Sequence, residues 1–152
     1  MTTQWRTYNY YGADRTPIAD LPWDGTHIYH VYCGVLANGD MALDAIVPMS
    51  EDAPNLISAA HAHGVKVLLV VGALDFGEGQ MYGTNLYNNA AANAWVAASK
   101  IVAAVNQYGY DGVALDIEWE PDFAESFPVL SELIRCLRLD AASASRHRSG
   151  RG

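Results

Sequence analysis

Residues 111–118 read Asp-Gly-Val-Ala-Leu-Asp-Ile-Glu, and their alternation constrains the fold more than any other stretch of the chain. Alternate side chains of a β-strand share a face, so Asp116 and Glu118 are expected to lie on one side. The apolar residues between them form the opposite face, which a helix can cover. Acidic groups at the carboxyl end of a buried strand are typical of active sites in α/β proteins. The stretch therefore predicts a buried strand that ends in a pair of carboxyl groups.

This spacing also predicts a particular chemistry. The two Cα atoms would lie about 6–7 Å apart, close enough for each carboxylate to disfavour ionisation of the other. A carboxyl group whose pKa is raised in this way can remain protonated near neutral pH and act as a general acid. We therefore expect acid–base chemistry at Asp116 and Glu118, with a purely structural polar pair as the alternative.

Strand and helix patterns alternate along the chain, which favours parallel βαβ units. The patterns predict strands near residues 6–11, 27–35, 66–72 and 112–118, and helices near 53–63, 88–107 and 123–138. A complete eight-stranded barrel takes about 250 residues, and this chain has 152. The expected fold is therefore α/β: a truncated (β/α)8 TIM barrel with a parallel sheet and about the first four βα units.

Composition divides the chain into a body and a tail. Residues 1–138 are expected to form the domain, and residues 139–152 a disordered basic tail of Ala, Ser, Arg and Gly without an apolar period. The net charge of −8 argues against a nucleic acid as partner. No apolar run is long enough to span a membrane, and the first residues lack the pattern of a signal peptide. We expect no membrane partner and leave the cellular location open.

The stretch 111–118 resembles Asp-x-x-Asp-x-Asp-x-Glu, the signature of glycoside hydrolase family 18, which contains chitinases and endo-β-N-acetylglucosaminidases. Asp111-Gly112, Asp116 and Glu118 match this signature in register, and Ala114 stands where the family has its middle Asp. Further similar landmarks occur at residues 9–11, 21–23, 26–28, 60–69 and 108–112. The resemblance covers roughly residues 5–130 and implies that residues 1–138 are the amino-terminal half of the catalytic barrel.

The resemblance implies a glycosidase that hydrolyses β-1,4-linked N-acetylglucosamine polymers, as a chitinase or an endo-β-N-acetylglucosaminidase. Such enzymes retain configuration and use the acetamido oxygen of the substrate as nucleophile. Glu118 matches the general acid/base, and Asp116 matches the carboxylate that orients the acetamido group. Asp111 and Gly112 match the start of the signature, where a structural role is expected. The implied partners are chitin or N-acetylglucosamine oligosaccharides, and neither a cofactor nor a metal ion is implied.

A second register remains open for the acid. The segment 116–120, Asp-Ile-Glu-Trp-Glu, resembles an Asp-Ile-Asp-Trp-Glu version of the signature, which would make Glu120 the acid. That register places Val113 at the leading Asp and loses the Asp-Gly match.

Aromatic residues near the strand ends are candidates for sugar binding, because sugar sites combine apolar faces with hydrogen-bonding groups. Tyr10 or Tyr11 matches a family tyrosine of the cleft floor, and His30 and Tyr32 are expected to face inward as an aromatic pair. Trp119 flanks the acid. Packing within the core is the alternative for each of these residues.

Two departures from the family pattern occur together. In the family, a Ser-x-Gly-Gly motif on the strand near 66–72 places a hydroxyl group beside the middle Asp, whereas here Val70 replaces the Ser and Ala114 the Asp. Losing both partners of a buried hydrogen bond can be nearly neutral, while losing one leaves the other unsatisfied. We therefore expect Val70 and Ala114 to be neighbours, and turnover to be slower or its pH optimum shifted.

Two alternatives to an active enzyme follow from these features. A chitinase-like lectin would keep the cleft without turnover, and an inactive fragment would lack the Tyr-Asp and Trp that the family carries on later strands. The open inner face of a half-barrel also predicts possible self-association.

Overall fold

The computed structural model describes residues 5–12, 15–45, 47–75, 81–118 and 123–149 of the chain. Four parallel strands form the main sheet in the order β1 (Thr7–Tyr10), β2 (His27–Val35), β4 (Lys66–Leu74) and β5 (Gly112–Glu118). A short strand, β3 (Met41–Ala42), pairs with β2 in the antiparallel direction. The predicted α/β fold with a parallel sheet is confirmed, and the four long strands occur where the sequence placed them.

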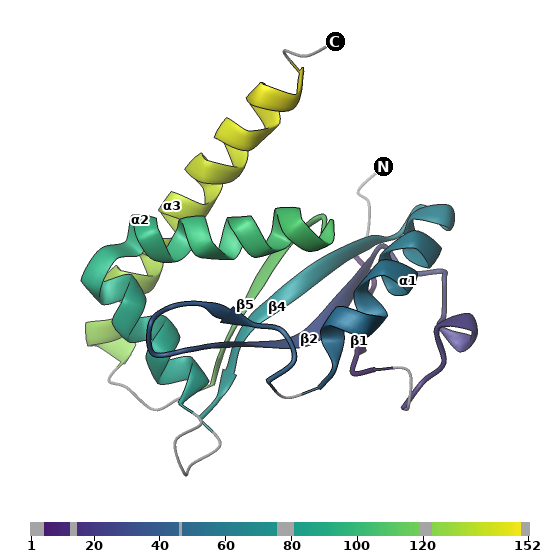
Figure 1. Cartoon of the computed structure of the whole chain (residues 1–152), viewed down its shortest axis with the longest axis horizontal. Helices are drawn as coiled ribbons and strands as arrows, with labels where there is room; N and C mark the ends of the chain where they lie inside the picture. The colour runs from purple at the N-terminus through teal and green to yellow at the C-terminus, as the bar shows by residue number, and fades with distance from the viewer. Residues whose placement is uncertain (1–4, 13–14, 46, 76–80, 119–122, 150–152) are drawn as a thin grey trace.

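The described residues also form three α-helices and one short 3-10 helix (Figure 1): α1 (Met49–Ala62), α2 (Tyr82–Tyr108), α3 (Phe123–Ser149) and η1 (Ile18–Asp20). The first helix packs on β2 and β4, the second packs on β2, β4 and β5, and the third packs on α2. Alternate residues of β4, Val67, Leu69 and Val71, are buried beneath these helices. The opposite face of the sheet carries Val70, Ala114 and Asp116, which line a cavity. No helix in the described part of the chain has the length and apolar character of a membrane span.

The second helix starts earlier than the sequence predicted and bends in its middle. The sequence patterns predict a strand that ends near residue 72 and a helix that begins near residue 88, but β4 continues to Leu74 and α2 begins at Tyr82. The amide of Thr84 donates to Asp75 over 3.1 Å, and its hydroxyl group donates to the same carboxylate. At Asn93 the backbone leaves the helical region, and the Asn93 side chain accepts a hydrogen bond from the Val96 amide over 3.1 Å. Asn93 thus caps the second half of α2, as Asn does at helix starts.

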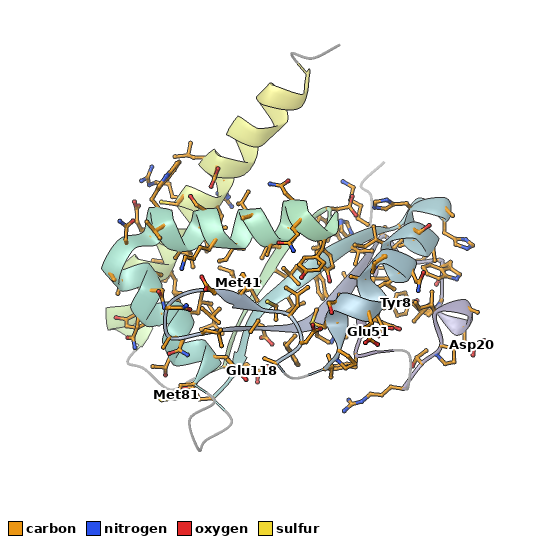
Figure 2. The ribbon with its side chains drawn as sticks, viewed as in Figure 1. Tyr8, Asp20, Met41, Glu51, Met81 and Glu118 are labelled. Atoms are coloured by element: carbon orange, nitrogen blue, oxygen red, sulfur yellow. The ribbon has the colours of Figure 1, made fainter. Side chains whose placement is uncertain are left out.

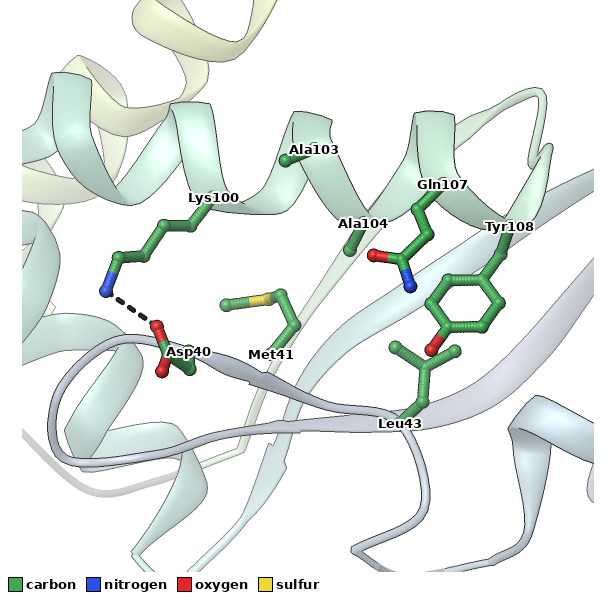
Figure 3. Close-up of a pocket in the computed structure, with 8 residues that line it drawn as sticks. All are labelled: Asp40, Met41, Leu43, Lys100, Ala103, Ala104, Gln107 and Tyr108. Carbon is green, nitrogen blue, oxygen red and sulfur yellow. Dashed lines mark hydrogen bonds and ion pairs between the residues drawn. The ribbon is translucent and has the colours of Figure 1, made fainter.

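The hairpin that contains β3 covers one side of α2 (Figure 3). Lys100 Nζ lies 2.9 Å from Asp40 Oδ1 and donates to the Asn38 carbonyl over 2.6 Å. Met41 and Leu43 lie below the helix, where a shallow pocket of about 260 Å³ opens. The sequence did not predict this hairpin, because a two-residue strand leaves no periodic signal.

The third helix differs from the prediction for the end of the chain. A disordered tail was expected from residue 139, but α3 continues to Ser149. Ala and Arg, which both favour helices, make up five of the eleven residues 139–149. The prediction relied on the absence of an apolar period, and that absence does not exclude an exposed helix. The division of the chain at residue 138 stays a prediction.

Asp111 connects three elements at the amino-terminal edge of the sheet. Its Oδ2 atom accepts a hydrogen bond from the Val67 amide over 2.8 Å and lies 2.9 Å from His61 Nε2. Its own amide donates to the Val67 carbonyl over 2.9 Å. The end of α1, the start of β4 and the turn before β5 therefore meet at one carboxylate, which fixes where β5 begins beside β4.

We predict that Asp111→Ala lowers the free energy of unfolding by about 1–3 kcal/mol, because it leaves the Val67 amide and His61 without their shared acceptor. Urea denaturation measures this loss. The matched control is Glu132→Ala, which removes an exposed carboxylate that pairs with Arg135 and should change stability by about 0.5 kcal/mol or less. Equal losses in the two variants would contradict a central role for Asp111.

Candidate active site

The pairing of β4 with β5 determines where the acidic residues lie. The register joins Val70 to Ala114, Gly72 to Asp116 and Leu74 to Glu118. Asp116 is half-buried and lines the cavity on one face of the sheet. Glu118 is exposed, and Figure 2 shows it at the carboxyl end of β5. The structure therefore brings the two predicted catalytic carboxyl groups to one end of one strand.

A cavity of about 310 Å³ lies against this part of the sheet. All four long strands contribute to its wall, which consists of Asn9, Tyr29, Val31, Tyr32, Val70, Ala114, Leu115 and Asp116. Sequence reasoning missed Asn9 and Tyr29. Alternation could have identified Asn9, because Tyr10 points into the helix-covered core and its neighbours in the strand must point the other way.

The predicted contact between Val70 and Ala114 is present. The two residues are direct partners in the parallel ladder, and both line the cavity. The wall beside Asp116 is therefore apolar at both positions where the family 18 pattern has polar side chains.

Gly72 is required by the close approach of β4 to Asp116. A Cβ atom at this position would lie 2.0 Å from the Asp116 carbonyl oxygen, and the Gly72 φ angle is +127°. A side chain therefore cannot be accommodated at Gly72 unless the two strands move apart.

The environment of Asp116 raises the pKa of its carboxyl group to about 6. Burial is the largest cause, since it removes water from the charged form. The neighbouring carboxyl group of Glu118 raises the pKa further, and the Tyr32 hydroxyl group acts in the opposite direction. The predicted coupling between the two carboxyl groups is thus visible as a raised pKa at Asp116.

Two tyrosines lie next to this pair. The rings of Tyr11 and Tyr32 meet edge to face with centroids 6.0 Å apart, and the Arg15 guanidinium lies 5.4 Å from the centre of the Tyr11 ring. Burial, Tyr11 and the two carboxyl groups together raise the pKa of Tyr32 to about 12. Tyr32 is therefore a neutral hydrogen-bond donor at physiological pH.

His30 and Tyr10 lie on the other face of the sheet, so the prediction that His30 faces inward with Tyr32 is wrong. His30 is fully buried, its Nδ1 atom lies 2.8 Å from the Tyr110 hydroxyl group, and its ring meets Tyr10 edge to face. The register of β2 with β4 shifts between His30 and Cys33, so residues 30 and 32 do not share a face as they would in a regular strand. His30 and Tyr10 therefore pack in the core, which is the alternative to sugar binding that the sequence left open.

Two further candidates cannot be placed. Trp119 and Glu120 lie outside the described residues. Glu118 and Glu120 therefore both remain candidates for the general acid. The described residues contain no group of three or more His, Cys, Asp or Glu side chains that could hold a metal ion.

Solved structures with the same arrangement are chitinases and a chitinase-like protein. A family 18 chitinase from Cycas revoluta in complex with (GlcNAc)3 has a TM-score of 0.71 at 21% identity over 93% of this chain and 43% of its own. A class V chitinase from Nicotiana tobaccum in complex with NAG4 gives 0.74 at 16% identity, over 97% and 41%. The chitinase-like agglutinin of Robinia pseudoacacia gives 0.75 at 19% identity, over 96% and 43%.

These likenesses show the fold: part of the TIM barrel of chitinases, as the sequence predicted. The chain spans about two fifths of the length of these relatives. No curated protein sequence matches it significantly.

The family itself follows from a sequence profile. The profile described as glycosyl hydrolase family 85 matches residues 49–149, more than half of the chain. The chain belongs to glycosyl hydrolase family 85. The predicted resemblance to family 18 is therefore supported at the level of the fold, and the matched family is a different one.

Replacing Gly72 tests the close approach of β4 to β5. Gly64 also has a positive φ angle, of +71°, but a Cβ atom there would meet nothing within 4 Å. Gly64→Ala should lower the free energy of unfolding by about 1–2 kcal/mol, from backbone strain alone. Gly72→Ala should cost at least about twice as much, because the Cβ atom also collides with the Asp116 backbone. Chemical denaturation gives both values, and similar losses would show that the strands can separate freely.

The raised pKa of Asp116 predicts a pH dependence of stability. The folded chain binds a proton at Asp116 more tightly than the unfolded chain, so the free energy of unfolding should fall as pH rises from about 4 to about 6. Asp116→Asn removes this charge, and the variant should gain stability relative to the wild type across that window. Thermal denaturation at several pH values measures the difference. Asp20→Asn, at an exposed position of η1, should keep the wild-type pH dependence.

Proposed function

We propose that this chain acts as a glycosidase on β-linked N-acetylglucosamine glycans, with Glu118 as the general acid/base and Asp116 as its partner. The observation that carries the proposal is the pair itself: an exposed Glu118 beside a half-buried Asp116 of raised pKa, at the carboxyl end of β5. Membership of a glycosyl hydrolase family and the fold of chitinases support this assignment.

The proposed reaction is substrate-assisted and retains the configuration of the sugar. Glu118 donates a proton to the glycosidic oxygen while the acetamido oxygen of the substrate attacks the anomeric carbon, so that the bond to the leaving sugar breaks. Asp116 accepts a hydrogen bond from the acetamido N–H and stabilises the positive ring that forms. Glu118 then takes a proton from water, whose oxygen attacks the same carbon while the bond from that carbon to the acetamido oxygen breaks and the acetamido group is restored. This scheme needs no nucleophile from the protein.

The substrate class has two candidates. A chitinase would cleave a polymer of N-acetylglucosamine, and an endo-β-N-acetylglucosaminidase would cleave within a glycan. Family 85 favours the endo-β-N-acetylglucosaminidase, while the solved complexes with (GlcNAc)3 and NAG4 are those of chitinases. Tyr11 and Tyr32 are the aromatic residues that we propose for sugar contact, together with Trp119.

Replacing each acid candidate by its amide tests the assignment. Glu118→Gln should lower kcat at least about 100-fold, since general acid catalysis contributes about 100- to 10,000-fold. Glu120→Gln is the matched control and should change kcat less than about 3-fold. Release of sugar from a chito-oligosaccharide and from a GlcNAc-containing glycan measures both variants. The reverse ranking would transfer the role to Glu120, and unchanged turnover in both would contradict the proposal.

A second candidate function is sugar binding without turnover. The apolar pair Val70 and Ala114 favours it, because these positions lack the polar groups of the family 18 pattern. The fold is also shared with an agglutinin. Calorimetric binding of a chito-oligosaccharide by a wild-type chain that releases no product would support this function over the enzyme.

Self-association through the open inner face stays a prediction. Within the described residues, β1 pairs with β2 alone and β5 pairs with β4 alone, so each has an edge that could meet another chain. A single monomeric species in light scattering would contradict it.

A further inference from the structure

The second strand departs from regular alternation beside the candidate active site. Its register with β4 shifts between His30 and Cys33, and the consecutive residues Val31 and Tyr32 both line the cavity. In a regular strand, neighbouring side chains point to opposite faces. Irregularities of this kind are over-represented next to active sites, where they redirect a side chain. The irregularity here places the Tyr32 ring on the same side of the sheet as Asp116.

Within the described residues, the polar side chains that line the cavity with Asp116 are those of Asn9, Tyr29 and Tyr32. The Glu118 carboxyl group also lies close enough to raise the Asp116 pKa, and Tyr32 alone of the three donates toward Asp116. The adjacent strand β4 presents Val70, which is apolar, and Gly72, which has no side chain. Ala114 precedes Asp116 on the same face of β5. From the side of β1, Tyr11 contacts the Tyr32 ring. A half-buried carboxylate is costly without a hydrogen-bond donor, so a donor in this cavity has a direct effect on Asp116.

We propose that Tyr32 is a positioning residue, whose hydroxyl group, held by the ring contact with Tyr11, donates to the Asp116 carboxylate. It supplies the polar partner that Val70 and Ala114 do not provide. The inference rests on the proposed function for its catalytic consequence alone, because the pairing of Tyr32 with Asp116 can be tested without a substrate.

Tyr32 would affect the proposed reaction through the Asp116 pKa, because its hydroxyl group is a neutral donor. Burial and Glu118 both favour the protonated form of Asp116, whereas the neutral Tyr32 hydroxyl group favours the anion and lowers the pKa. In the proposed reaction, the anion is the form that accepts a hydrogen bond from the acetamido group. Tyr32 therefore extends the range of pH in which Asp116 can hold the substrate in position.

The experiment is a titration of the Asp116 carboxyl carbon by 13C NMR in the full chain without substrate. Tyr32→Phe keeps the ring and removes the donor, so the Asp116 pKa should rise by about 0.5 or more. Tyr29→Phe is the matched control, because Tyr29 lies on the same strand and lines the same cavity. It should leave the Asp116 titration unchanged. Equal titration curves for the wild type and Tyr32→Phe would overturn the proposal.

A second variant keeps the test valid if Tyr32→Phe does not fold. Tyr11→Ala removes the ring that contacts Tyr32 but leaves the Tyr32 hydroxyl group in the chain, so the Asp116 pKa should rise in the same direction by a smaller amount. A fall, or no change, would contradict the proposed role of Tyr11 in holding Tyr32.

Hydrolysis provides a separate readout. In an active chain, Tyr32→Phe should move the acidic limb of the pH profile of kcat/KM upward, together with the NMR titration. If the wild type hydrolyses nothing but Tyr32→Phe still raises the Asp116 pKa, the proposed function fails and the pairing stands. If the wild type is active and the titration does not change, the function stands and the role of Tyr32 is wrong.

Discussion

The pairing of β4 with β5 is the interaction on which the rest of the site depends. It runs without interruption from Leu68 beside Gly112 to Leu74 beside Glu118. Asp111 fixes its start through the Val67 amide, and Gly72 allows the strands to approach closely at Asp116. A slip of one residue in this ladder would turn every side chain to the other face and carry the carboxyl groups into the helix-covered core. The register therefore also determines where the candidate active site lies.

Much of this arrangement could be predicted from the sequence, because it depends on local alternation. The alternation of apolar and acidic residues in 112–118 indicates a strand. The long strands at 27–35 and 66–74 carry a similar signal. In each of these segments, the pattern of residues and the need to bury one face both predict a β-strand. The contact between Val70 and Ala114 was expected instead from the resemblance to the family 18 motifs.

The sequence predictions that differ from the structure failed for other physical reasons. His30 was expected to share a face with Tyr32, but the register shift between them depends on contacts with β4 that alternation along one strand does not report. The bend at Asn93 lies within a run of helix-favouring alanines, and it depends on a side-chain cap. The helical end of α3 lacks an apolar stripe, so no period indicates it. Tertiary contacts decide the first case, and local hydrogen bonding or propensity decides the other two.

The environment of Asp116 differs from the family 18 pattern in one carboxyl group, since Ala114 stands where that pattern has an Asp. A neutral hydroxyl group, that of Tyr32, lies in the same cavity. A carboxylate beside Asp116 can share a proton with it, and each protonation of such a pair changes the pKa of its partner. A tyrosine hydroxyl group with a pKa near 12 cannot exchange a proton with Asp116 in the acidic range, so it acts as a fixed donor. The carboxyl groups at the end of β5 are therefore those of Asp116 and Glu118, whereas the family 18 signature adds another at the position of Ala114. With one carboxyl group fewer, burial and Glu118 on one side and Tyr32 on the other determine how much of Asp116 is ionised at a given pH.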